Sequence, residues 1–130
     1  LLHANRVDFT LAWRRLADAA EGHAAPLRAL FADQAALDAW LARWHARCAA
    51  EEPMAAPERA QAMRRTNPWL IPRNHRVEEA LTAASEQGDY TVLQHLLAAL
   101  AQPYEDDPEY FDYRTPPAPS ERVYQTFCGT

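Results

Sequence analysis

The chain has 130 residues, a formal net charge of −5 and a pI of about 5.5, and all 13 of its basic residues are arginine. Its length and its shares of apolar (48 %) and charged (24 %) residues are those of one folded domain with a real core. An acidic chain without a basic stripe is not expected to take nucleic acid or an anionic membrane surface as its main partner.

The composition also predicts the compartment. No apolar run approaches the roughly 20 residues of a membrane span, and the first residues lack the order of charge, apolar run and small residues that marks a signal peptide. Two cysteines, Cys48 and Cys128, are too few for a disulfide framework. We therefore expect a cytoplasmic protein, and the alanine-rich, all-arginine composition is typical of a GC-rich bacterial genome.

The first predicted helix lies in DFTLAWRRLADAAEG. Its apolar residues recur at i, i+3, i+4, i+7 and i+8, the stripe of an amphipathic helix. Asp8 is the expected N-cap, and Gly22 the expected end. The residues predicted to face the core are Phe9, Ala12, Trp13, Leu16 and Ala17.

A second helix is predicted in DQAALDAWLARWHARCAAEE, with Asp33 as its N-cap. Its inward face is expected to carry Leu37, Trp40, Leu41, Trp44 and Cys48. Because Cys48 extends an aromatic stripe, we interpret it as a small core residue. His45 and Cys48 have a spacing that suits two metal ligands, but no second pair completes the four ligands of a structural zinc site, so no metal site is predicted.

A third, shorter helix is predicted over residues 57–66, because Pro57 suits a first helical turn and Asn67-Pro68 ends a helix. The connector that follows, NPWLIPRN, is too apolar for an ordinary surface loop. We expect Trp69 and Ile71 to insert into the core.

Residues 74–102 predict an antiparallel helical hairpin. Gly88 is expected to end its first helix in the left-handed conformation, and Asp89 to cap the second, which Pro103 closes. The faces predicted to be apolar are Val77, Ala80, Leu81 and Ala84 on the first helix, and Leu93, Leu96, Leu97 and Leu100 on the second.

Beyond the hairpin, the chain is rich in proline, acids and tyrosine without a sustained period, which predicts an extended tail. No alternating run rich in Val, Ile or Thr indicates a strand. The fold class is thus all-α, with about five helices. We expect a helical domain over residues 1–102 and a tail over residues 103–130 whose acidic run, EDDPE, is a solvated face.

Read together, several stretches resemble the carboxy-terminal region of the selenoprotein O (SelO) family. They are RVDFTLAWRRLADA, WLARWHARC, NPWLIPRNHRVEEAL, GDYTVLQHLLAALAQPYEDDPEY and TFCGT, in the family's order. The resemblance implies a parent protein with a kinase-like amino-terminal part, which transfers AMP from ATP to protein hydroxyls. That part is the implied partner of this segment, and ATP with Mg or Mn are its implied cofactors.

The resemblance also implies what these 130 residues lack. The family's glycine-rich loop, phosphate-anchoring lysine and metal-binding Asp and Asn belong to the kinase-like part, so the segment alone is expected to be inactive. The family places selenocysteine or cysteine near the carboxy-terminus, where Cys128 lies, and links it to redox control through a cysteine of the kinase-like part.

The connector matches the family's Asn-Pro and Arg-Asn pairs, which implies a structural role for Asn67, Pro68, Arg73 and Asn74. The alternative is that these residues only shape a turn and cap a helix. For the chain as a whole, the alternative to a SelO-type segment is a free-standing helical module that binds a partner peptide without catalysis.

Overall fold

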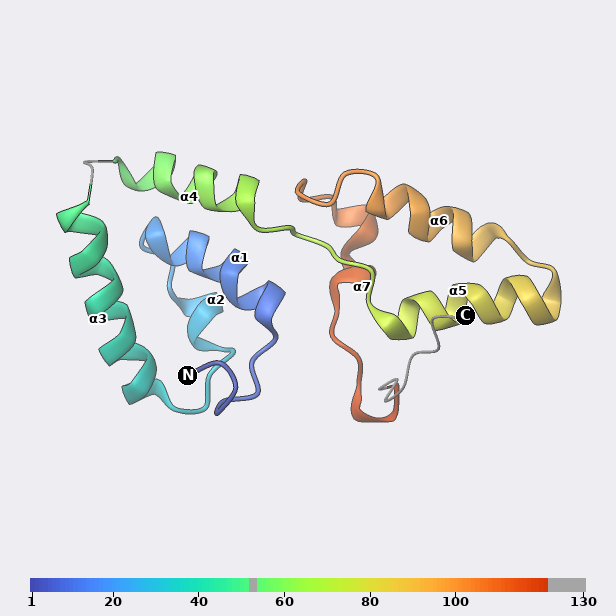
Figure 1. Ribbon diagram of the computed structural model, residues 1–130, viewed down its shortest axis with the longest axis horizontal. Coiled ribbons are helices and arrows are strands. Elements are labelled where there is room, and N and C mark those ends of the chain that lie inside the picture. The colour runs from blue at the N-terminus through green and yellow to red at the C-terminus, as the bar shows by residue number, and fades with distance from the viewer. Residues whose placement is uncertain (52–53, 122–130) are drawn as a thin grey trace, which may run out of the picture. The chain divides into compact units, whose positions relative to one another are not determined.

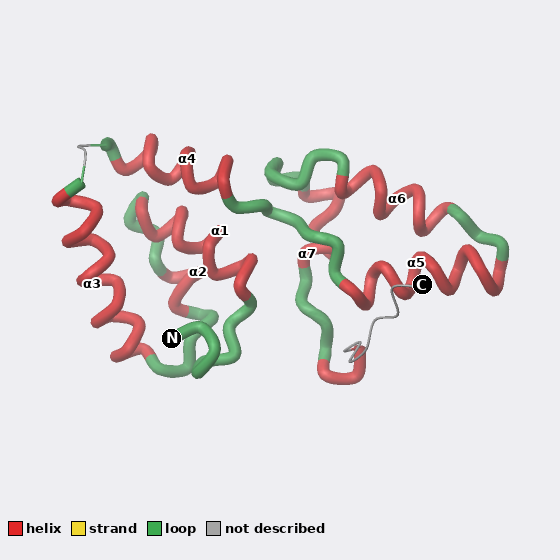
Figure 2. The backbone as a smooth tube through the Cα atoms, in the orientation of Figure 1, coloured by secondary structure: helices red, strands yellow, loops and turns green. Residues whose placement is uncertain are grey.

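The computed structural model describes residues 1–51 and 54–121. In these two ranges the chain forms seven α-helices, two single-turn 3-10 helices and no strand (Figure 2). The predicted all-α class is confirmed. Over the same ranges, no helix combines the length and the apolar character needed to cross a bilayer.

The chain divides into two compact units, Leu1–Pro68 and Trp69–Thr130. The boundary predicted after residue 102 falls inside the second unit. The helices of the first unit are α1 (Phe9–Ala20), α2 (Ala25–Arg28), α3 (Gln34–Ala50) and α4 (Ala56–Thr66). In this unit α1 packs against both α2 and α4 (Figure 1).

Short-range signals set the ends of these helices. The Asp8 carboxylate accepts a hydrogen bond from the Leu11 N–H at 2.9 Å, and the Asp33 carboxylate accepts one from the Ala36 N–H at the same distance. Both residues are the predicted N-caps, and each satisfies one of the free N–H groups of a first turn. Pro57 lies in the first turn of α4 as predicted.

The core of the first unit is mostly aliphatic, with one phenylalanine, and comes from α1, α2, α3 and the turn after α2. Its buried members are Leu16, Ala19, Leu27, Phe31, Leu37 and Leu41. Two residues predicted to belong to it do not. Phe9 is 65 % exposed because it is the first residue of α1, and its ring meets the Trp13 ring edge-on at a centroid distance of 5.7 Å. Cys48 is half-buried in the last turn of α3.

The second unit is built on the predicted hairpin of α5 (Asn74–Gln87) and α6 (Thr91–Leu100). Gly88 ends α5 with φ 67° and ψ 15°, the left-handed conformation predicted for it. Asp89 lies one residue before the position that caps α6. Its carboxylate still accepts hydrogen bonds from the N–H and the hydroxyl of Thr91, at 2.9 and 2.6 Å.

The face that the hairpin buries is narrower than predicted. Leu81 and Leu97 are 49 % and 58 % exposed, and the buried residues are Ala80, Ala83, Leu96 and Ala99. Each exposed leucine directly follows a buried residue, and one step along a helix turns the side chain by about 100°. The mostly small buried residues let the two helices pack closely, which leaves the leucines outside the contact.

The proline-rich segment contains short helical elements in addition to the extended chain that was predicted. They are η1 (Pro108–Tyr110), α7 (Phe111–Arg114) and η2 (Pro119–Glu121). Asp107 starts η1 by accepting a hydrogen bond from the Glu109 N–H at 2.9 Å, and the fixed φ of Pro108 suits a first helical position. Tyr110 and Tyr113 then pack on the core of this unit.

Candidate functional site

The connector motif ends the first unit at Asn67 and Pro68. The backbone N–H of Asn67 and its side-chain amide both donate to the Met63 carbonyl at 2.9 Å, so this residue closes the last turn of α4. Pro68 follows and cannot continue the helix. Asn67 therefore acts as the C-cap of α4, with φ −108° and ψ 119°.

A buried arginine holds this helix end from α1. Arg14 is 4 % exposed, and its Nη1 donates to the carbonyls of Arg64 and Asn67 at 2.9 and 3.2 Å. A cation at the carboxyl end of a helix is favoured by the helix dipole and satisfies carbonyls that lack an intrahelical partner. The position of Arg14 links α1 to the connector motif.

Sequence reasoning missed Arg14, and no local signal distinguishes it from Arg15. Arg15 lies half-exposed and pairs with Asp18 one turn further along α1, at 3.2 Å. Which of the two arginines is buried depends on the direction from which α4 approaches α1.

A second contact between α1 and α4 runs through Arg64. Its Nη2 lies 2.9 Å from Asp18 Oδ1 and 2.6 Å from Glu21 Oε2. These hydrogen bonds raise the pKa of Arg64, that to Glu21 most. About a third of the Arg64 side chain is exposed, so the pairs contribute less to stability than their short distances suggest.

In the second unit, the connector is held by the loop after α6. The N–H groups of Trp69 and Leu70 both donate to the Pro103 carbonyl, at 2.7 and 3.1 Å. Trp69 is buried as predicted, but Leu70 rather than Ile71 is the second buried residue, with 2 % exposure. Since one carbonyl accepts from both consecutive N–H groups, the chain turns here and does not alternate as a strand would.

Arg73 and Asn74 end the connector at the start of α5. Arg73 is 7 % exposed, and its Nε donates to the carbonyl of Arg114 at 2.8 Å. Its own carbonyl accepts from the N–H groups of Arg76 and Val77, so Arg73 is the N-cap of α5 by its backbone. Asn74 is the first residue of α5 and is exposed.

Arg114 completes this arrangement from α7. It is 7 % exposed, and its guanidinium lies over the Trp69 ring at 5.2 Å from the centroid. A desolvated cation over an indole face is attracted by the ring's negative charge. The connector is thus held in the second unit by two buried arginines on different elements, and sequence patterns predicted only Arg73.

An aromatic cluster joins His95 of α6 to tyrosines of η1 and α7. His95 Nδ1 lies 3.0 Å from the Tyr113 hydroxyl, and its ring meets the rings of Tyr110 and Tyr113 at 5.3 and 5.6 Å. Arg76 adds a cation 5.8 Å from the Tyr113 centroid. Burial raises the pKa of the Tyr113 phenol. His95 and Tyr113 lie 18 positions apart along the chain, so no local sequence pattern shows that they meet.

His75, at the second position of α5, has a buried ring nitrogen. Its Nδ1 is buried and has no hydrogen-bond partner among the described residues. Desolvation, followed by the nearby Arg76 charge, lowers the pKa of this imidazole. The folded state therefore favours neutral His75.

Cys128 lies outside the described residues. His45 and Cys48 lie on α3, and the His45 ring meets that of Trp44 at 4.9 Å. Over residues 1–51 and 54–121, no three His, Cys, Asp or Glu side chains are grouped so as to hold a metal ion. Arg14 in the first unit and Arg73 in the second each bind a backbone carbonyl through a charged hydrogen bond.

The chain is similar in sequence to known protein nucleotidyltransferases. Protein nucleotidyltransferase YdiU of Bradyrhizobium sp. strain BTAi1 is 56 % identical over 128 residues, which are 98 % of this chain and 26 % of the relative. YdiU of Rhizobium leguminosarum bv. trifolii is 52 % identical over 132 residues, and YdiU of Rhizobium meliloti 48 %, each across the whole of this chain.

The chain spans about a quarter of the length of these curated relatives, 26 % and 27 % for the two rhizobial proteins. No protein-family model matches it. The similarity supports, at the level of the family, the relationship predicted from the sequence motifs, and the relatives are bacterial, as the composition predicts for this chain.

Proposed function

We propose that the chain is the carboxy-terminal helical segment of a SelO-type protein adenylyltransferase, an enzyme that transfers AMP from ATP to Ser, Thr or Tyr hydroxyls of proteins. The observation that carries the proposal is the 56 % identity over 98 % of the chain to a nucleotidyltransferase about four times as long. Under this proposal the kinase-like part supplies ATP and metal binding, and the segment described here braces it.

The bracing role is supported by how the connector is held. In the first unit a buried arginine of α1 holds the end of α4. In the second, Arg73 Nε donates to the Arg114 carbonyl, and the Arg114 guanidinium lies over the Trp69 ring. Hydrogen bonds of this kind, made by desolvated charges, are costly to break because each loss leaves a buried charge without compensation. Such hydrogen bonds are expected in a rigid segment that supports another part of the protein.

The test begins with the coding sequence before Leu1. A kinase-like domain there, and transfer of labelled AMP from ATP to protein by the complete product, are the expected results. Deleting residues 1–130 should reduce the transfer. A reading frame that starts at this chain would overturn the proposal and favour the free-standing interaction module.

The segment by itself should neither bind Mg-ATP tightly nor transfer AMP, because the resemblance assigns the phosphate-anchoring and metal-binding residues to the kinase-like part. Calorimetric titration of the 130-residue chain with ATP and magnesium measures this. Micromolar binding would contradict the assignment of the chemistry to that part.

A redox role for Cys128 is part of the same proposal. It is supported by the position of this residue in TFCGT near the chain end, which matches the family's pattern. In the complete protein we expect a reversible disulfide between Cys128 and a cysteine outside this segment, visible by mass spectrometry under non-reducing conditions. A bridge between Cys48 and Cys128 would contradict it.

A further inference from the structure

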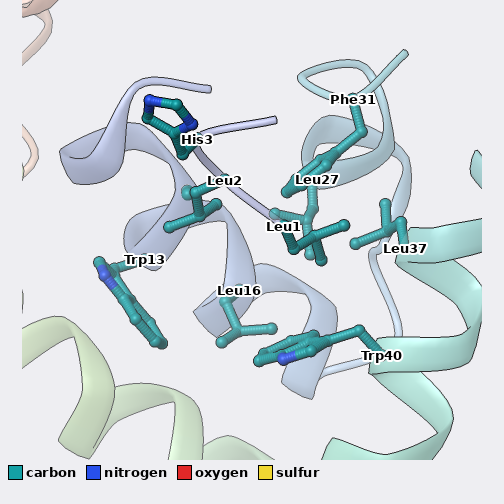
Figure 3. A pocket seen from close by; sticks show the side chains of 10 residues that line it. Leu1, Leu2, His3, Trp13, Leu16, Leu27, Phe31, Leu37 and Trp40 are labelled. Atoms are coloured by element: carbon teal, nitrogen blue, oxygen red, sulfur yellow. The ribbon is translucent and has the colours of Figure 1, made fainter. Parts of the chain in front are cut away.

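An apolar groove lies between α1 and α3 in the first unit, and Arg59 and Met63 of α4 also line one end of it. Two cavities of about 350 and 520 Å³ make it up, and they adjoin because Trp13 and Leu16 of α1 line both. On α3, the first cavity is lined by Leu37 and Trp40, and the second by Trp44 and Cys48. Figure 3 shows Trp13 and Trp40 on opposite sides of the first cavity, with Leu16 between them. We call this surface the α1–α3 groove.

The groove is rich in aromatic side chains that the unit itself covers only in part. Trp40 and Trp44 are stacked at a centroid distance of 6.2 Å with nearly parallel rings, and both are half-buried. At the other wall, Phe9 is 65 % exposed. Contiguous exposed apolar surface of this kind marks an interaction site in a soluble domain.

The dimensions and chemistry of the groove fit a helix. From Leu37 to Cys48 the α3 wall rises by about 16 Å, which is three helical turns. A polar rim borders its far end, where Arg47 pairs with Glu51 at 2.9 Å and Arg59 donates to the Cys48 carbonyl at 3.0 Å. An apolar floor with a charged rim is the surface that an amphipathic helix binds through residues at i, i+3 or i+4, and i+7.

The position of the first residues indicates where such a helix comes from. Leu1, Leu2 and His3 themselves line the first cavity (Figure 3). Under the proposed function, the upstream polypeptide joins the chain at Leu1 and therefore at the first cavity; the relatives of this chain are about four times as long. A segment joined by a short tether reaches an effective concentration in the millimolar range.

We propose that the α1–α3 groove receives an amphipathic helix from the upstream part of the same polypeptide. This inference rests on the proposed function, since it needs a longer parent protein, and it names the surface through which the segment would brace the kinase-like part. A second copy of this chain and a separate protein are the competing occupants.

Cys48 provides a probe of the groove. Cys48 is half-buried and lines the second cavity, so we expect its thiol to react with a maleimide in the 130-residue chain. A helix bound across Trp44 and Phe9 would cover it. Labelling of Cys48 is followed at the level of peptides by mass spectrometry, in the 130-residue chain and in the complete protein, so other cysteines do not interfere.

Two variants of the complete protein make the comparison specific. Phe9→Asp removes an exposed groove residue without disturbing the core, and an acid in a first helical turn is favoured by the helix dipole. Leu97→Asp is the matched control, because Leu97 is similarly exposed, 58 % against 65 % for Phe9, and lies in the second unit outside the groove.

Labelling of Cys48 in the complete protein should be slower than in the 130-residue chain by on the order of tenfold or more. Phe9→Asp should restore most of the rate, and Leu97→Asp should leave the protection in place. Equal rates in the two unaltered proteins, or protection that survives Phe9→Asp, would overturn the proposal. Slow labelling of the 130-residue chain that depends on its concentration would overturn it in favour of a second copy.

The transfer of labelled AMP by the same complete protein separates the two proposals. Active enzyme with fully accessible Cys48 refutes the groove proposal alone. Inactive protein with protected Cys48 refutes the proposed activity and leaves the groove occupied as described.

Discussion

The turn between α5 and α6 depends on a single residue in the left-handed conformation, Gly88, with φ 67° and ψ 15°. Its N–H and that of Asp89 both donate to the Ala83 carbonyl, which closes the end of α5. A Cβ built on Gly88 meets no atom within 4 Å. Substitution therefore changes the backbone energy alone, without a steric clash.

Two opposing effects set the magnitude. A side chain in the left-handed region costs about 1–2 kcal/mol, while replacing glycine reduces the entropy of the unfolded chain and returns about 0.4–1 kcal/mol. We expect Gly88→Ala to destabilise the protein by about 0.5–1 kcal/mol, and Gly88→Val by about 1–2 kcal/mol because a β-branched side chain tolerates this conformation least. Gly88→Asn should be nearly neutral, since Asn adopts it readily.

Urea unfolding followed by far-ultraviolet circular dichroism measures the series. The midpoints should fall in the order Gly, Asn, Ala, Val with unchanged slopes, because the exposed area on unfolding stays the same. An unchanged midpoint for Gly88→Val would refute the left-handed assignment. A large loss for Gly88→Asn would show that space, not backbone conformation, limits the turn.

Three further predictions follow from contacts elsewhere in the chain. Arg14→Met should lower the free energy of unfolding by about 2–4 kcal/mol, because two charged hydrogen bonds to the end of α4 are lost. The control Arg15→Met should change it by no more than about 0.5 kcal/mol. Equal effects of the two substitutions in urea unfolding would contradict the role of Arg14. Asp33→Ala should cost about 1 kcal/mol by the same assay through loss of the N-cap of α3, and no change would argue against that cap. Folding lowers the pKa of His75. The stability that depends on neutral His75 is therefore present above the ordinary histidine pKa near 6.5 and is lost as the pH falls through the pKa of the folded state. His75→Gln should flatten that pH dependence, and an unchanged slope between the two proteins would exclude His75 as its source.

Features that depend on a few neighbouring residues were predicted from the sequence. The caps at Asp8 and Asp33 need only a side chain that reaches back to an N–H three residues away. The end of α5 needs only a residue that accepts positive φ, and Gly88 is one. These energies are local, so the order of residues suffices to locate them.

Burial at the edges of the apolar faces could not be predicted in the same way. Periodicity places Phe9, Leu81 and Leu97 on apolar faces, yet all three are exposed. A hydrophobic stripe shows which residues could be buried together, but whether another element covers its edge depends on how the helices cross. The partly uncovered apolar faces of α1 and α3 form the α1–α3 groove, in which we propose that a further helix binds.

The candidate site likewise contains features that the sequence predicted and contacts that only the tertiary structure decided. Asn67-Pro68 predicted a helix end, and α4 ends there with Asn67 as its C-cap. The partners of the connector lie far along the chain: Arg14 donates to carbonyls 50 and 53 residues away, and Arg73 donates to the Arg114 carbonyl 41 residues away. Arg14 and Arg15 are chemically identical neighbours, and only the approach of α4 decides which guanidinium loses water and binds the free carbonyls of a helix end.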